Sequence, residues 1–255
     1  MHTCKQQLDA KKFSCWIVFI GWMFLLSASV WAAEDHKIFG ELLTKYNQEG
    51  HVDYAGFKRQ ETLLDAYLES LAKIDPDSLP RNERFAFYVN AYNAWTIKLI
   101  LSEYPGVESI KDLGSLFKSP WKKKIVNLGG MTTTLDHIEH DILRPEFKDP
   151  RVHFAINCAS KGCPPLYQEP FAGSQLDMQL NEVTRHFINN PELNRLEGNV
   201  LYVSSIFKWF LEDFNNDIIG FFEQYASDRL KNQIITRRSS LNIKYLDYDW
   251  SLNGK

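Results

Sequence analysis

The spacing of apolar residues predicts a chain made mostly of helices. Apolar side chains recur at helical intervals in residues 36–48 and again in residues 56–73, so each range predicts an amphipathic helix. In residues 81–102 apolar side chains occupy most faces, which is expected of a helix at the centre of a fold. Further helices are predicted at residues 135–143, 175–189, 206–213, 216–226 and 228–235.

Shorter segments predict extended structure. Residues 124–134 predict a β-hairpin, because Gly129 and Gly130 supply a turn between two short runs. Thr134 and Ser174 are candidate caps of the helices that follow them, and we expect Pro145 to close the first of these. Three other extended segments are predicted, at residues 151–157, 200–203 and 243–250. The predicted class is therefore α+β, mostly helical with a small antiparallel sheet.

The N-terminal residues have the pattern of a secretory signal. Three lysines precede an apolar run over residues 13–30, and the run ends in small residues that suit signal peptidase. We expect cleavage after Ala32, which leaves residues 33–255 as a single globular domain in a secreted or periplasmic location. The apolar run is also close to the length that spans a bilayer, so an uncleaved membrane anchor is the alternative.

Composition narrows the range of partners. Without residues 1–32 the net charge is −5, whereas a nucleic-acid partner would require a basic face. The chain has no phosphate loop, dinucleotide fingerprint or His-Glu-x-x-His motif, so we expect neither a cofactor nor a metal. The expected partner is a peptide or small-molecule substrate, and a membrane only if the signal stays uncleaved. The sequence leaves the oligomeric state open.

Candidate catalytic groups gather in the middle third of the chain. Asp136, Glu139 and His140 share a predicted helix, and His153 lies inside a predicted strand. Cys158 follows that strand in a loop of small and polar residues, where active-site groups often lie. A catalytic thiol needs a base that forms the thiolate and a group that orients the base. His140 or His153 is the candidate base.

The neighbours of His140 suit different tasks. Asp136 is four residues earlier and therefore reaches the same helix face. Glu139 is adjacent to His140 and points about 100° away around the helix. It is therefore better placed to anchor the surroundings of His140 than to bond directly to its ring. His137 is interpreted as a surface or packing residue. Backbone N–H groups after Cys158 are candidates for an oxyanion site.

The cysteines permit other interpretations. Cleavage of the signal removes two of the four cysteines and leaves Cys158 and Cys163, which an oxidising compartment allows to pair. Such a disulfide would indicate a non-catalytic domain that binds a peptide or an envelope component. A zinc site made by both cysteines and two histidines is a further alternative, although the spacing matches no standard finger or ribbon.

Two asparagines stand out in the apolar helix of residues 81–102. Asn90 and Asn93 are three residues apart and so lie on one side. Because buried amides need partners, we interpret them as making helix-to-loop hydrogen bonds, with a direct binding role as the alternative. We expect this helix to line a cleft in which Cys158 and His140 lie within a few ångströms of each other.

Several motifs, in order along the chain, carry a family resemblance. They are residues 87–94, 104–105 with 109–110, 135–140 with 143–144, 151–160, 163–166, 207–210 with 213–214, and 248–253. Together they resemble the family named domain of unknown function 547, over most of residues 33–255. That family is similar to papain-like or transglutaminase-like thiol enzymes. The resemblance implies that Cys158, His140 and Glu139 form a catalytic set, with His153 close by.

Overall fold

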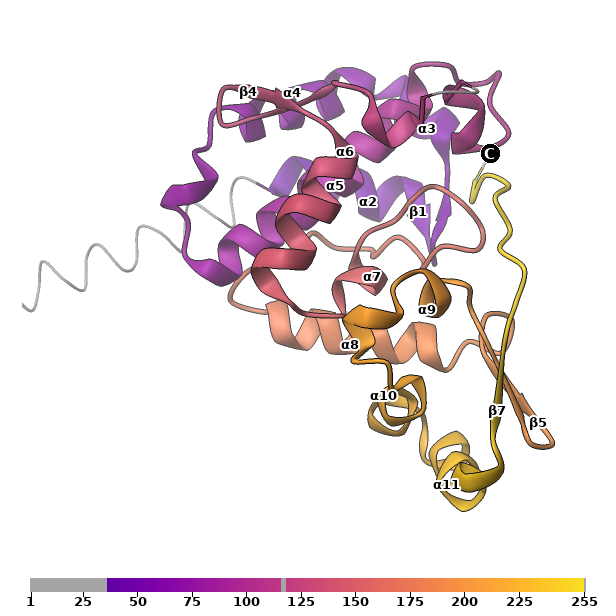
Figure 1. The fold of residues 1–255 in the computed structure, drawn as a ribbon. Coiled ribbons are helices and arrows are strands. Elements are labelled where there is room, and N and C mark those ends of the chain that lie inside the picture. The colour runs from indigo at the N-terminus through magenta and orange to yellow at the C-terminus, as the bar shows by residue number, and fades with distance from the viewer. Residues whose placement is uncertain (1–35, 116–117, 255) are drawn as a thin grey trace, which may run out of the picture.

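Helices form most of the structure, as the apolar spacing predicts (Figure 1). The computed structural model describes residues 36–115 and 118–254, so the predicted signal segment lies outside the described residues. The α-helices are α2 (Lys37–Tyr46), α3 (Tyr54–Arg59), α4 (Glu61–Ala72), α5 (Arg81–Leu101), α6 (Leu135–His137), α7 (Val152–Ala155), α8 (Leu176–Ile188), α9 (Ile206–Trp209), α10 (Ile218–Tyr225) and α11 (Asp228–Arg237). None of these described helices is long and apolar enough to cross a membrane.

Helices of other types connect these elements. A π-helix, η4 (Ile138–Phe147), continues α6 directly. The 3-10 helices are η1 (Pro76–Ser78), η2 (Ile110–Leu113), η3 (Pro120–Lys122), η5 (Leu211–Phe214) and η6 (Arg238–Ser240). Segments of π-helix are rare and occur frequently at functional sites, which draws attention to η4.

Helix α5 lies at the centre of the hydrophobic core. Most of its residues after Arg84 are buried, including both asparagines. It packs against α3 and α4 and against η4, so elements from both sides of the sequence cover it. The prediction of a central helix over residues 81–102 is confirmed, because a helix without a polar face must be covered all round.

The strands form small sheets. β1 (Asn47–Gln48) pairs with β2 (His51–Val52), and β3 (Val126–Leu128) pairs with β4 (Met131–Thr133); both pairs are antiparallel. Gly129 and Gly130 turn the second hairpin with φ values of 54° and 77°, as predicted. β6 (Val200–Val203) pairs antiparallel with β5 (Arg195–Glu197) and parallel with β7 (Asn242–Tyr245). This last sheet is mixed, because α9–α11 supply the long crossover that parallel neighbours require.

The strand predicted at residues 151–157 is wrong. The chain forms helix α7 there, and all four of its residues are buried. A short helix surrounded by protein has no polar face, so its apolar run resembles that of a buried strand. His153 therefore lies on a helix, and Cys158 follows a helix.

The helix predicted at residues 135–143 is confirmed at its start and wrong at its end. Thr134 caps it, because its Oγ1 accepts a hydrogen bond from the N–H of His137 at 3.0 Å. The helix then changes to the π form and continues through Pro145 to Phe147.

Two smaller predictions also differ from the structure. Residues 56–73 form two helices rather than one, because the chain turns at Gln60 between α3 and α4. Ser174 does not cap α8; Gln175 precedes that helix and makes no side-chain capping bond.

The C-terminal segment returns across the molecule after β7. Figure 1 shows this yellow segment running from the region of α11 back towards α3 and β1. Backbone pairs join Val52 to Gly254 and Ser160 to Leu252 along its path. The segment thereby brings Tyr248 and Trp250 next to the loop that carries Cys158.

Candidate active site

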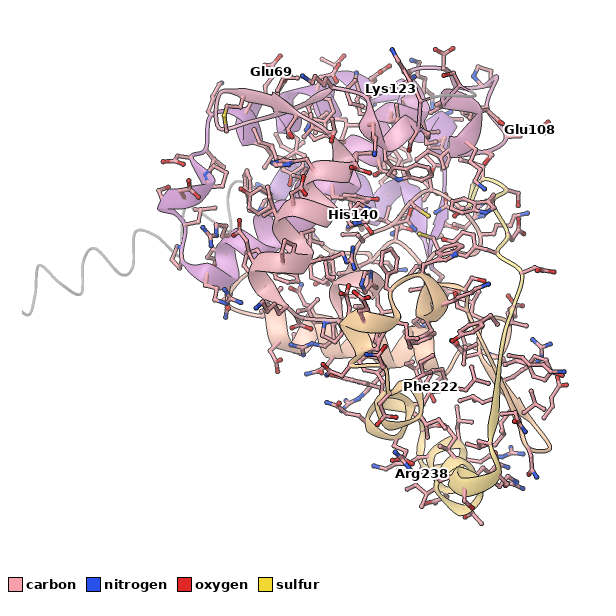
Figure 2. The ribbon with its side chains drawn as sticks, in the orientation of Figure 1. Glu69, Glu108, Lys123, His140, Phe222 and Arg238 are labelled. Carbon is pink, nitrogen blue, oxygen red and sulfur yellow. The ribbon has the colours of Figure 1, made fainter. Side chains whose placement is uncertain are left out.

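One cavity brings the candidate catalytic residues together. Its volume is about 250 Å³, and its lining includes Asp136, Glu139, His140, His153 and Cys158. These side chains come from α6, η4, α7 and the loop after α7. Figure 2 shows His140 near the middle of the molecule, between the helices of the first half and the C-terminal elements.

Helix α5 supports the cavity from behind and contributes none of the lining residues that the structure describes. The Nδ2 of Asn93 donates to the carbonyl of Ala155 at 3.0 Å, and its Oδ1 accepts from the N–H of Asn157 at 2.8 Å. Asn90 makes the same pair of bonds with the backbone of Phe171, both at 2.8 Å. The helix-to-loop interpretation is confirmed. The expectation that α5 lines the cleft is wrong, because the side-chain amides of Asn90 and Asn93 are fully engaged in hydrogen bonds to the neighbouring loops.

The loop that carries Cys158 turns sharply. Asn157 fixes its base, because its Nδ2 donates to the carbonyl of Pro164 at 2.7 Å and its Oδ1 accepts from the N–H of Ala159 at 2.9 Å. Ala159 has a φ of 62°, a left-handed conformation that costs about 1–2 kcal/mol for a residue other than glycine. The turn folds Ser160 back onto the Cys158 sulfur, and such strain is typical of functional sites.

The environment of Cys158 favours its thiolate. Its Sγ lies 2.7 Å from Cys163 Sγ, 3.0 Å from Ser160 Oγ and 3.1 Å from Tyr248 Oη. Burial raises the pKa of Cys158, but hydrogen bonds from these three groups lower it further than burial raises it, to about 7. Burial and the neighbouring Cys158 both raise the pKa of Cys163. Cys158 is thus the more acidic thiol of the pair, and the Cys163 thiol donates a hydrogen bond to its sulfur.

The structure does not support the disulfide interpretation, because both cysteines are free thiols. A metal site has no support either. Among the described residues, no group of three or more His, Cys, Asp or Glu side chains is arranged to hold a metal ion.

His140 is held by Arg144. An Nη1 hydrogen of Arg144 donates to the Nδ1 of His140 at 3.0 Å. Arginine has only donors, so this Nδ1 must be the acceptor, and the hydrogen of the neutral ring lies on Nε2. The partner of this ring nitrogen is therefore Arg144 rather than Asp136. In this arrangement the ring offers a hydrogen-bond donor to the cavity, which differs from the expected role of a base.

His153 is paired with a carboxylate. Its Nε2 donates to Asp213 at 2.7 Å, while Arg144 binds the same carboxylate through Nε at 2.6 Å and Nη2 at 3.1 Å. Burial raises the pKa of Asp213, but His153 and Arg144 hold it far below its usual range. The His153 ring stacks on Phe210, and burial lowers its pKa. His153 therefore anchors Asp213 and Arg144, which in turn hold His140.

Glu139 is a buried carboxyl at the cavity. The Oη of Tyr92 donates to its Oε2 at 3.1 Å. Burial raises the pKa of Glu139, and the bond from Tyr92 and the proximity of His140 offset this only in part. Burial thus makes Glu139 a weaker acid than an exposed glutamate, and buried carboxyl groups of this kind transfer protons in other enzymes.

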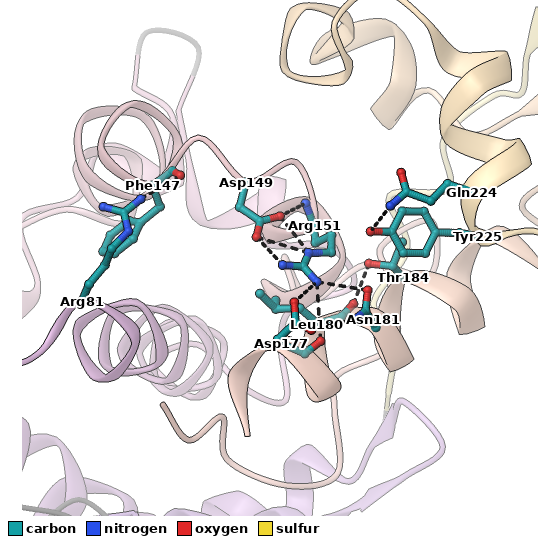
Figure 3. Close-up of polar contacts among 10 residues, drawn as sticks. All are labelled: Arg81, Phe147, Asp149, Arg151, Asp177, Leu180, Asn181, Thr184, Gln224 and Tyr225. Atoms are coloured by element: carbon teal, nitrogen blue, oxygen red, sulfur yellow. Dashed lines mark hydrogen bonds and ion pairs between the residues drawn. The ribbon is translucent and has the colours of Figure 1, made fainter. Parts of the chain in front are cut away.

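A second polar cluster fixes the position of α7 (Figure 3). Arg151, immediately before α7, binds Asp149 through Nη2 at 2.7 Å, and its Nη1 reaches Asp177 and Asn181 on α8 at 2.7 and 3.0 Å. The hydrogen bond with Asp149 raises the pKa of Arg151. The guanidinium is therefore paired within the protein, and it fastens the start of α7 to α8.

Sequence reasoning assigned no role to several residues of this site. They are Tyr92, Arg144, Ser160, Asp213 and Tyr248. All five lie in the motifs that carry the family resemblance, which therefore offered a signal. Ser160 and Arg144 are also close in sequence to Cys158 and His140, whereas Asp213 and Tyr248 reach the site only through the fold.

The structure defines the class of protein as a helix-rich α+β protein with a cysteine, histidine and carboxyl group around one cavity. Residues 76–188 match the model of the family described as protein of unknown function, DUF547, and this segment belongs to that family. The resemblance seen in the sequence is confirmed there, and the segment includes His140 and Cys158. No curated protein and no solved structure matches the chain.

Proposed function

We propose that this chain is a thiol-dependent hydrolase or acyl transferase that acts on a peptide or amide bond, with Cys158 as its nucleophile. The main observation in favour of this proposal is that the Cys158 sulfur lies at the cavity and that three hydrogen-bonding groups lower the pKa of its thiol. The thiolate is the reactive form of cysteine. His140 and Glu139 in the same lining supply a hydrogen-bond donor and a carboxyl group beside the sulfur, which supports acyl chemistry at the thiol.

The first step is attack of the Cys158 thiolate on the carbonyl carbon of the substrate. A carbon–sulfur bond forms, and the carbonyl oxygen takes up the negative charge. The Nε2–H of His140 stabilises this oxyanion, because Arg144 holds Nδ1 as the acceptor. His140 thus acts as a neutral hydrogen-bond donor to the developing charge.

Glu139 transfers the protons. Its uncharged carboxyl protonates the leaving nitrogen as the carbon–nitrogen bond breaks, which leaves an acyl group on Cys158 and a carboxylate at Glu139. The carboxylate then accepts a proton from water, or from another acceptor, as that nucleophile attacks the thioester. The carbon–sulfur bond breaks, the thiolate returns, and Glu139 is again protonated.

Burst kinetics with 4-nitrophenyl acetate test the proposal. The intact protein is expected to release about one equivalent of 4-nitrophenol quickly and further product more slowly, as in covalent catalysis. Cys158→Ser should abolish the burst. Glu139→Gln keeps an acceptor for Tyr92 but cannot take a proton, so its burst should remain while its steady rate falls. Release of nitrophenol by Cys158→Ser at the rate of the unaltered protein would refute the proposal.

We also propose that residues 1–32 direct export and are then removed. The lysines before the apolar run and the small residues at its end support this role. N-terminal sequencing of protein recovered outside the cytoplasm should begin at Ala33. A mature chain that begins at Met1 would favour the uncleaved anchor.

A further inference from the structure

The cavity lining contains two chemically different groups of residues. Carboxyl and imidazole groups from α6, η4 and α7 form the first group. The second group consists of the mutually packed rings of Trp121, Trp209, Tyr248 and Trp250, which we call the aromatic wall. The proposed chemistry uses the first group and assigns no task to the rings of the second.

The rings of the aromatic wall hold one another in place. Tyr248 and Trp250 have ring centroids 4.5 Å apart, and Trp209 lies 4.8 Å from Tyr248 and 5.7 Å from Trp250. Trp121 meets Trp250 edge to face at 6.0 Å. The rings come from η3, α9 and the C-terminal segment, so distant parts of the chain converge to build one surface.

Part of this surface stays open. Trp209 is 46% exposed, although it is among the largest apolar side chains of the protein. A contiguous apolar patch rimmed by polar residues marks a binding site, and Trp209 belongs to a cluster of four rings beside the polar groups of the cavity. Trp209 packs on Trp250 at an interplanar angle of 25°, and the Nζ of Lys111 lies 3.6 Å from the centroid of the Trp250 ring. The exposed ring of Trp209 is therefore the surface that is open to a flat group.

The aromatic wall begins at the nucleophile. The Oη of Tyr248 donates a hydrogen bond to the Cys158 sulfur, 3.1 Å away, while its ring contacts Trp209 and Trp250. A group that rests on the wall is therefore within one side chain's length of the sulfur. The cavity volume of about 250 Å³ lies just below the usual range of small-molecule pockets, which suits one residue-sized group.

We infer that the aromatic wall selects substrates whose acyl part carries an aromatic side chain next to the carbonyl that Cys158 attacks. This substrate class rests on the proposed thiol chemistry. Stacking on Trp209 would hold the ring, and the carbonyl carbon would then lie at the sulfur. An aromatic ring stacks on the flat face of Trp209, which an aliphatic side chain of the same length cannot do.

The test compares the 4-nitrophenyl esters of N-acetyl-phenylalanine and N-acetyl-alanine on the full chain. In each case the thiolate forms a bond to the carbonyl carbon and 4-nitrophenolate leaves with the electron pair; water later releases the acid. We expect kcat/KM to be at least tenfold higher for the phenylalanine ester. Trp209→Ala should reduce this ratio to about twofold or less, and Trp209→Phe should keep an intermediate ratio.

Tyr245→Ala is the matched control. Tyr245 is a partly exposed aromatic residue on β7 that does not line the cavity, so its loss should leave the ratio unchanged. Equal kcat/KM values for the two esters, with a Cys158-dependent burst, would overturn the aromatic preference and leave the proposed function standing. A lack of any Cys158-dependent release from either ester would overturn both.

Discussion

Replacing Asn93 by leucine tests how α5 controls the reactive loop. The substitution removes the side-chain amide that bonds to two buried backbone groups, the carbonyl of Ala155 and the N–H of Asn157. Both backbone groups are then left without a partner. Each buried group left without a partner costs about 1–3 kcal/mol, so the free energy of unfolding should fall by about 2–6 kcal/mol. Urea unfolding at neutral pH measures this loss. An unfolding free energy equal to that of the unaltered protein would refute the burial argument.

Asn90→Leu provides the matched control on the same helix. Asn90 makes the same pair of backbone bonds, but with Phe171, away from the Cys158 loop. We expect a similar loss of stability from both variants. Only Asn93→Leu should also slow the alkylation of Cys158 by iodoacetamide, because only it releases the loop that holds the sulfur among its donors. Equal alkylation rates in the two variants would show that α5 does not position the thiol.

Other substitutions make separate predictions. Cys163→Ala removes a donor to the Cys158 thiolate, so the pKa of Cys158 should rise and its alkylation at pH 6 should slow several-fold. Tyr248→Phe removes another donor and should also slow the alkylation of Cys158. The preference for the aromatic ester should persist in this variant, because the ring remains. Asp213 has a folded pKa below its unfolded value of about 3.9, so its charge stabilises the fold above that pH and the benefit is lost as the pH falls below it. Asp213→Asn should therefore lower the free energy of unfolding at pH 7, and lower it less at pH 3, when each is measured by urea unfolding against the unaltered protein. A loss that is equal at the two pH values would contradict this.

The turnover rate should depend on pH, because the pKa of Cys158 is lowered and the pKa of Glu139 is raised. The lowered pKa of Cys158 makes the thiolate available as the pH rises through it. The raised pKa of Glu139 keeps the carboxyl protonated until the pH exceeds it, after which the acid is lost. The profile of kcat/KM should therefore rise and then fall. With an amide substrate, Glu139→Gln should lose most of its turnover at every pH, and an amide profile that this substitution leaves unchanged would assign the acid to another group.

Local patterns predicted the parts of the fold that local forces determine. Helix α5 was evident because its apolar residues cover most faces, and the burial of Asn90 and Asn93 followed from their place on it. The hairpin turn at Gly129 and Gly130 was evident because few other residues adopt positive φ easily. Each of these features is specified by residues that are near one another in the sequence.

The remaining features depend on contacts between distant segments. Helix α7 was interpreted as a strand because burial on all sides removed its periodic signal. The bond between Arg144 and His140 lies within one π-helix, yet Arg144 is oriented by Asp213, which comes from η5. Tyr248 reaches Cys158 only because β7 pairs with β6 and the chain then returns across the molecule. The periodicity of a single sequence does not predict contacts between residues that are so far apart in the chain.

The most direct test of the central claim is the pH dependence of alkylation at each cysteine, followed by peptide mass spectrometry of the full chain. Cys158 should react with iodoacetamide along a titration curve that lies below the value of about 8.5 for a free cysteine, while Cys163 stays unmodified over the same range. Equal labelling of the two thiols, a Cys158 titration at or above about 8.5, or a Cys158–Cys163 disulfide that persists under mild reductant would contradict the account.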